Sequence, residues 1–172
     1  MFEGWGNFYF LLGSASASLI GLMFVVTTLT RGSERSQVER GQRLFMTPTV
    51  FNFASVLTLS AVALAPRLTP GLQLGAMGVL GAYGLGYAVV IIWQGSQAVL
   101  REHFNPHWSD LWCYGLIPLV IYLALEASVL ATTSGYNLGG YTIAASLLGI
   151  LLIAVRNAWD LVTWMAPRRS TE

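Results

Sequence analysis

The sequence predicts an all-α integral membrane protein, a single transmembrane domain over residues 1–172 that forms a bundle of about five helices. The first observation is composition: 55% of the 172 residues are hydrophobic and 10% are charged, whereas soluble domains carry about 25% charged residues. The second is pattern, because the apolar residues form five runs of the ~20 residues that a helix needs to cross a bilayer. These runs lack the alternation of polar and apolar residues that is typical of membrane strands.

The predicted spans cover residues 8–30, 44–65, 72–94, 111–132 and 138–165. The small residues of "GSASAS" could mark a signal-peptide cleavage site, but no basic residue precedes them and the apolar run resumes through Leu29. We therefore expect a retained first helix. The second span follows the charged connection 31–43 and carries Pro48 in its first turn, where a missing N–H costs little. The third follows the turn "PRLTPG", the fourth the loop "REHFNPHWSD", and the fifth the turn "TSGYN".

The arginines predict the orientation of the chain. They gather in the first and third connections and after the last span, at Arg31, Arg35, Arg40, Arg43, Arg101, Arg168 and Arg169. The opposite side of the predicted bundle holds Arg67. The positive-inside rule then predicts an N-terminus outside and a C-terminus in the cytoplasm, in a plasma or inner membrane. The arginines of the first connection would also attract anionic lipid at the inner face.

Two spans carry small residues at four-residue spacing, the pattern by which membrane helices approach each other closely. These residues are Gly13, Ala17 and Gly21 in the first span and Gly78, Ala82 and Gly86 in the third. One interpretation is packing within the five-helix bundle. The other is that one of the two faces is a subunit interface, and because two such faces exceed what one seam needs, we expect a homo-oligomer.

The second span has a short polar stripe, because Asn52 and Ser55 lie four and seven residues after Pro48 and share its helical face. Such a stripe either forms hydrogen bonds to a neighbouring helix or lines a wet cavity.

Three ionisable residues lie within the spans, namely Glu126, Arg156 and Asp160. Arg156 and Asp160 are four residues apart on one helical face, so we expect them to form an ion pair near the inner headgroups. Glu126 is a poor partner for Arg156. It lies about 22 Å from the inner end of its helix, whereas Arg156 lies about 27 Å from the outer end of the next.

Glu126 leaves two alternatives open. Arg67, at the outer end of the second span, could reach the carboxylate and form an ion pair with it. Otherwise the carboxyl is buried without a cation, a condition that favours its neutral form. Protonatable acids that face a cavity are typical of proton and cation pathways. Glu126, Asn52 and Ser55 are therefore the candidate pathway residues.

The sequence offers little for catalysis or cofactor binding. His103 and His107 are weak candidate metal ligands, because Pro106 interrupts a regular helix and two more ligands would have to come from elsewhere. Cys113 is the single cysteine and is expected to be a packing residue. No phosphate loop, dinucleotide fingerprint or nucleophile elbow is present, and lysine is absent. We expect no cofactor, and the net charge of +1 argues against nucleic-acid binding.

Three functions are compatible with these features. The first is a small channel or transport protein whose ion, proton or small-solute pathway forms in a homo-oligomer. The second is a non-catalytic accessory or scaffold subunit that packs against a larger membrane partner. The third, an intramembrane enzyme, has only Glu126 and the two histidines to support it and is disfavoured.

Overall fold

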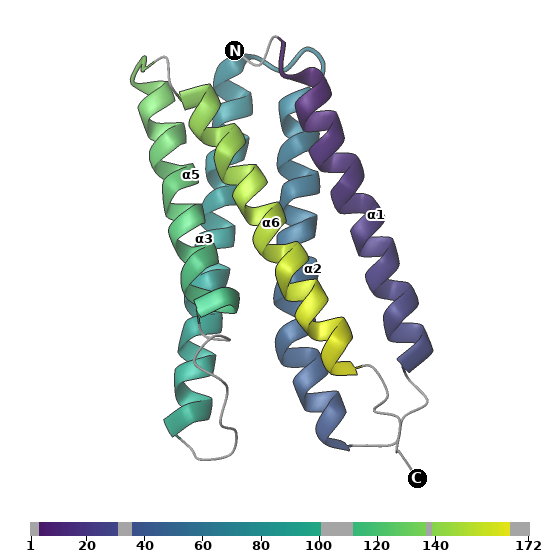
Figure 1. The fold of residues 1–172 in the computed structure, drawn as a ribbon. Coiled ribbons are helices and arrows are strands. Elements are labelled where there is room, and N and C mark those ends of the chain that lie inside the picture. Colours follow the sequence, from purple (N-terminus) through teal and green to yellow (C-terminus); the bar gives the residue numbers. More distant parts are fainter. Residues whose placement is uncertain (1–3, 31–35, 101–111, 137–138, 166–172) are drawn as a thin grey trace.

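The computed structural model describes residues 4–30, 36–100, 112–136 and 139–165 (Figure 1). They form five long helices and one short π-helical turn, with no strand in these ranges. The helices are α1 (Gly6–Thr30), α2 (Ser36–Leu64), α3 (Pro70–Leu100), α5 (Ile117–Thr133) and α6 (Gly139–Met165), and the π-helical turn η1 (Trp112–Leu116) leads into α5.

All five helices contain a stretch that is long and apolar enough to cross a membrane. These stretches are Gly6–Leu29, Met46–Leu64, Pro70–Gln97, Trp112–Thr133 and Gly139–Thr163. The predicted all-helical class and the predicted number of apolar helices are therefore confirmed.

Two boundaries differ clearly from the prediction: α2 begins earlier, and α3 continues to Leu100, six residues beyond the predicted end at residue 94. Residues 36–43, assigned to a connection, belong to α2. The reason is that hydropathy marks where lipid contact begins, whereas helical hydrogen bonding continues through good helix formers such as Gln, Glu and Arg.

The helices pack with α2 and α6 at the centre of the bundle (Figure 1). α2 contacts α1, α3 and α6, whereas α6 contacts α1, α2 and α5. α3 and α5 form a pair on one side, and α1 covers the other side. Successive helices run in opposite directions, so the start of α1 and the end of α6 lie at opposite ends of the bundle.

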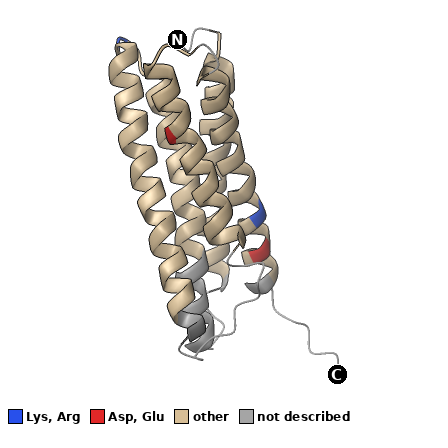
Figure 2. Ribbon diagram, turned by 90° about the vertical axis from the view of Figure 1, so that its left-hand side faces the viewer, with Lys and Arg blue, Asp and Glu red and all other residues tan. Residues whose placement is uncertain are grey.

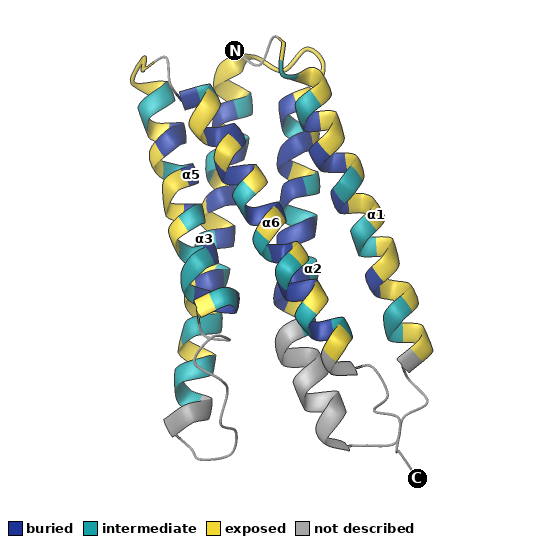
Figure 3. Cartoon of the chain, viewed as in Figure 1, coloured by how far each residue is buried: buried dark blue, intermediate teal, exposed yellow. Residues whose placement is uncertain are grey.

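Apolar side chains occupy both the interior and the outer surface. Tyr9, Phe53, Met77, Tyr122 and Leu147 are fully buried along the inner faces of the helices. Large apolar residues are also exposed on α1, α3, α5 and α6, and exposed positions recur along these helices (Figure 3). An apolar exterior is unfavourable in water but suits a lipid environment, and this arrangement fits a multi-pass membrane protein.

Charged side chains are rare in the bundle. Within the ranges whose side chains are described, they are Arg67, Glu126, Arg156 and Asp160 (Figure 2). Arg67 lies in the α2–α3 turn, whereas the other three lie inside apolar helices.

Candidate functional site

Glu126 lies at the edge of the face of α5 that packs against α3. Leu125, Tyr122 and Val129 point into the core from the same helix, and the 100° step between residues places Glu126 beside them. Its side chain is half-buried. Its Oε1 atom is fully buried and has no hydrogen-bond partner among the described residues. This atom is therefore an acceptor without a donor inside an apolar helix pair.

Two glycines of α3 make room for the carboxyl. A Cβ at Gly81 would collide with Oε1 of Glu126 and would lie 3.3 Å from its Cδ atom. A Cβ at Gly78, one turn earlier, would lie 3.9 Å from Oε2 and 3.6 Å from Cγ1 of Val129. The Glu126 carboxyl thus lies against bare helix backbone, in the space that two absent side chains leave.

Arg67 does not neutralise this carboxyl. It is exposed, and its φ of 67° places it in a left-handed turn conformation before α3 begins at Pro70. Gly81 lies eleven residues after Pro70, or about 16 Å along the helix. Within the described residues no ion pair joins Arg67 to Glu126.

Arg156 is also remote from Glu126. A Cβ at Gly149 of α6 would lie 3.4 Å from Ile121, so Glu126, five residues further along the antiparallel α5, lies level with Ala144. Arg156 is twelve residues beyond Ala144, a separation of about 18 Å.

Asn52 and Ser55 face the same region of α5. The Tyr122 hydroxyl donates a hydrogen bond of 3.2 Å to Oδ1 of Asn52, and both side chains are buried. Ser55 donates to the Phe51 carbonyl at 3.0 Å and also interacts with Tyr122. Tyr122 lies one helical turn from Glu126. We call Asn52, Ser55, Tyr122 and Glu126 the polar seam.

The polar seam depends on a further glycine of α3. A Cβ at Gly84 would lie 2.6 Å from Cζ and 2.7 Å from Cδ1 of Tyr122, so the phenol ring packs directly on the helix backbone. Next to it, Phe51 of α2 stacks on Tyr87 of α3 with ring centroids 4.1 Å apart. α2, α3 and α5 therefore meet through aromatic rings, glycines and a few polar groups.

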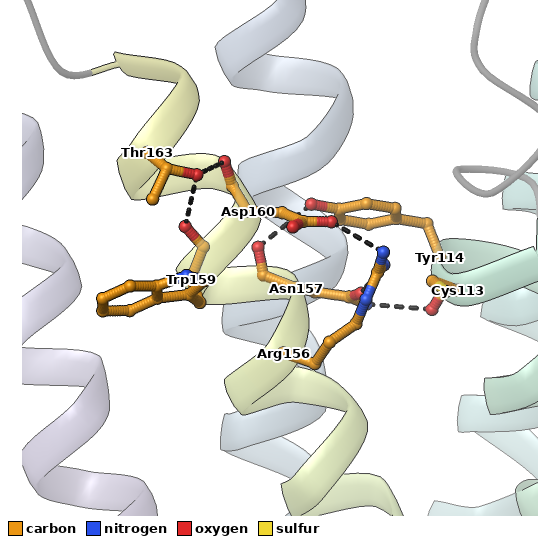
Figure 4. A network of polar contacts seen from close by, with 7 residues as sticks. All are labelled: Cys113, Tyr114, Arg156, Asn157, Trp159, Asp160 and Thr163. Atoms are coloured by element: carbon orange, nitrogen blue, oxygen red, sulfur yellow. Dashed lines mark hydrogen bonds and ion pairs between the residues drawn. The ribbon is translucent and has the colours of Figure 1, made fainter.

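A second polar cluster joins α6 to η1 near the other end of the bundle (Figure 4). Asn157 is fully buried, and its Nδ2 atom donates to the Cys113 carbonyl at 2.9 Å. The Tyr114 hydroxyl donates to the Asn157 carbonyl at 3.0 Å. Arg156 donates to Oδ1 of Asn157 at 3.2 Å and forms an ion pair of 2.9 Å with Asp160.

Pro118 explains why the Cys113 carbonyl needs a side-chain donor. In a π-helical turn the carbonyl of residue i accepts from the N–H of residue i+5. For Cys113 that residue is Pro118, which has no N–H. The amide of Asn157 supplies the missing hydrogen bond from another helix, which fixes the start of α5 against α6.

The predicted small-residue faces divide between the interior and the surface. Gly13 packs against α2, with its Cβ position 3.3 Å from Cβ of Ser60, whereas Ala17 and Gly21 are exposed. On α3, Gly78 faces α5, whereas Ala82 and Gly86 are exposed and nothing lies within 4 Å of the Gly86 Cβ position. The face of α3 that contacts α5 consists of Gly78, Gly81 and Gly84.

The sequence reasoning missed Tyr122, Asn157, Gly81 and Gly84. A tyrosine one turn from a buried acid, and an asparagine facing a proline-broken helix start, are signals that could have identified two of them. The weak metal candidates His103 and His107 lie outside the described residues. Within the described ranges no three His, Cys, Asp or Glu side chains come together.

No protein-family model, no curated protein and no solved structure matches this chain.

Proposed function

We propose that this chain is a small homo-oligomeric membrane protein that forms or supports a pathway for ions, protons or small solutes, with Glu126 as its ion-binding group. The observation that carries the proposal is the buried Oε1 of Glu126, which lacks a hydrogen-bond partner among the described residues. An acid inside a membrane helix is costly, and the usual reason to retain one is a pathway or a proton relay.

The polar seam supports the same function. Glu126 and Tyr122 are one turn apart on α5, and the Tyr122 hydroxyl reaches Asn52 across the bundle. Polar groups from α2 and α5 thus lie within one helical turn of Glu126 along α5. Polar groups this near to the carboxyl support its role in a pathway.

We propose the orientation that the arginines indicate, with the N-terminus outside and the C-terminus in the cytoplasm of a plasma or inner membrane. α5 then runs outward, and Glu126 lies seven residues before its end at Thr133, or about 10 Å from the outer surface. The arginines after the first span would contact anionic lipid at the inner face.

The homo-oligomer is supported by the small residues that the bundle leaves on its surface. Ala17 and Gly21 on α1, and Ala82 and Gly86 on α3, face outward, where a further helix could approach closely. The same surfaces support the alternative function, a non-catalytic accessory subunit of a larger membrane complex.

Flux measurements in liposomes test the proposal. Wild-type protein is expected to carry ion or proton flux above that of protein-free liposomes, and Glu126→Gln is expected to lose it, because glutamine keeps the size but not the ionisable group. Ser134→Ala, in the exposed α5–α6 turn, is the control variant. Absence of flux from folded wild-type protein, together with a defined hetero-complex after mild detergent extraction, would favour the accessory subunit.

A further inference from the structure

We infer that the ion held by Glu126 is a proton rather than a metal cation, and that Gly81 is the positioning residue that keeps the carboxyl in its binding site. This inference rests on the proposed function and names the ion of that same site.

The surroundings of the carboxyl decide between the two kinds of ion. A metal cation that leaves water must exchange its hydration shell for several oxygen ligands. Gly78 and Gly81 lie against the Glu126 carboxyl from α3, and Leu125 and Val129 flank those glycines from α5. The glycines lie inside a helix, where their carbonyls are engaged in helical hydrogen bonds. The Tyr122 hydroxyl is engaged with Asn52, and Oε1 of Glu126 has no hydrogen-bond partner among the described residues. These contacts supply no second oxygen ligand for a metal cation, whereas one carboxyl is sufficient for a proton.

Charges do not change this assignment. α3 presents two glycines to the carboxyl, and the nearest titratable side chain on α5 is Tyr122, one turn away. Arg67 lies in the turn before α3, and Arg156 and Asp160 form an ion pair with each other on α6. Since no described cation stabilises the carboxylate form, a bound proton neutralises the acid in place.

Gly81 controls the position of the carboxyl. A methyl group at this position would occupy the place of Oε1. The colliding group is the end of a flexible side chain, so the Glu126 carboxyl would move while the two helices stay packed. Gly81→Ala should therefore displace the acid without removing it. Gly75→Ala is the matched control, because it adds the same methyl group to the same helix at an exposed position where nothing lies within 4 Å.

The half-buried side chain makes the site accessible to a lipid-soluble probe. Dicyclohexylcarbodiimide reacts with a protonated carboxyl: the acid oxygen bonds to the central carbon, the O–H proton moves to nitrogen, and the adduct rearranges to a stable N-acylurea. A carboxylate that holds a metal cation is protected from this reaction. The adduct is measured by mass spectrometry of the intact protein in liposomes at neutral pH.

We expect one adduct on wild-type protein, none at this position on Glu126→Gln, and unchanged labelling in NaCl, KCl or choline chloride of equal ionic strength. Protection by NaCl or KCl relative to choline chloride would overturn the proton assignment. So would absence of the adduct from wild-type protein. These labelling outcomes do not depend on flux, so they separate failure of this inference from failure of the proposed function.

Flux tests the role of Gly81. Gly81→Ala is expected to lose most of the proton flux and to change the rate of carbodiimide labelling, while it elutes from a sizing column like wild type. Gly75→Ala is expected to retain both wild-type values. Equal flux and labelling in wild type and Gly81→Ala would show that Gly81 does not position the carboxyl. Glu126-dependent flux of Na⁺ or K⁺ without proton flux would support the proposed pathway. It would contradict the inference that the bound ion is a proton.

Discussion

At the scale of single residues, the bundle holds its polar side chains in two different ways. The Tyr122 hydroxyl donates a hydrogen bond to Asn52 across the bundle, and the Asn157 amide donates one to a backbone carbonyl. The Oε1 atom of Glu126 instead has no hydrogen-bond partner among the described residues. Buried polar atoms in native proteins are nearly always paired, so an exception draws attention to function. The hydroxyls of Ser16 and Ser60 are also buried without a partner in the described ranges, but Glu126 differs from both because its side chain can ionise.

Removal of the Tyr122 hydroxyl should be mildly destabilising. Tyr122→Phe leaves Oδ1 of Asn52 without its donor, and hydrogen bonds between membrane helices contribute about 0.6 kcal/mol on average. We expect Tyr122→Phe to lower the free energy of unfolding in mixed detergent micelles by about that amount. The loss should largely disappear in an Asn52→Leu background. Tyr136→Phe, at an exposed position in the α5–α6 turn, should have no effect, and equal losses in both variants would contradict the assignment.

At the scale of helices, the start of α5 is the least regular part of the described bundle. The π-helical turn and Pro118 together leave the Cys113 carbonyl without a helical donor. Asn157 compensates from α6, and the ion pair of Arg156 and Asp160 lies directly beside it. A helix that begins in this way is positioned by its neighbour, since its own backbone hydrogen bonds are incomplete.

Asn157 and Pro118 should therefore be energetically coupled. Asn157→Leu should lower the free energy of unfolding by about 1–3 kcal/mol, the cost of a buried unpaired polar group. Pro118→Ala restores a backbone N–H, so the same substitution should cost less in that background. A double-mutant cycle in mixed micelles measures the coupling. Asn52→Leu with Pro118→Ala is the control and should be additive; additivity of the Asn157 pair would refute the explanation.

At the scale of the whole molecule, five antiparallel helices place the start of α1 and the end of α6 at opposite ends of the bundle. The two ends of the bundle must then face opposite sides of any membrane that it crosses. The positive-inside rule predicts from the arginines which of these sides is cytoplasmic. Topology is thus a property of the helix number and of the loop charges together.

Cysteine labelling in intact cells tests this topology. In a Cys113→Ser background, Ser134→Cys should react with a membrane-impermeant maleimide from outside. Ser170→Cys, after the last helix, should react only once the membrane is permeabilised. The reverse pattern would show that the orientation is inverted, and labelling of both sites in intact cells would refute an odd number of crossings.

Hydropathy along the chain was sufficient to predict the class of the protein and its five apolar helices. Long apolar runs have one stable form in lipid, because every backbone polar group must be paired inside the segment. The spacing of Arg156 and Asp160 likewise indicated their pairing, since it depends only on the geometry of one helix. These properties are local, so no knowledge of the neighbouring helices was needed.

Contacts between helices were settled by packing in three dimensions. The spacing rule suggested Gly78, Ala82 and Gly86 as one face of α3, but rotation of the helix places Gly78, Gly81 and Gly84 against α5. Nothing near Glu126 in the chain indicates those glycines, and nothing near Asn157 indicates Cys113. In a membrane every helix face is apolar, so hydrophobicity does not distinguish the face that meets a neighbour from the face that meets lipid. Shape complementarity between side chains makes that choice, and it exists only once the helices are packed.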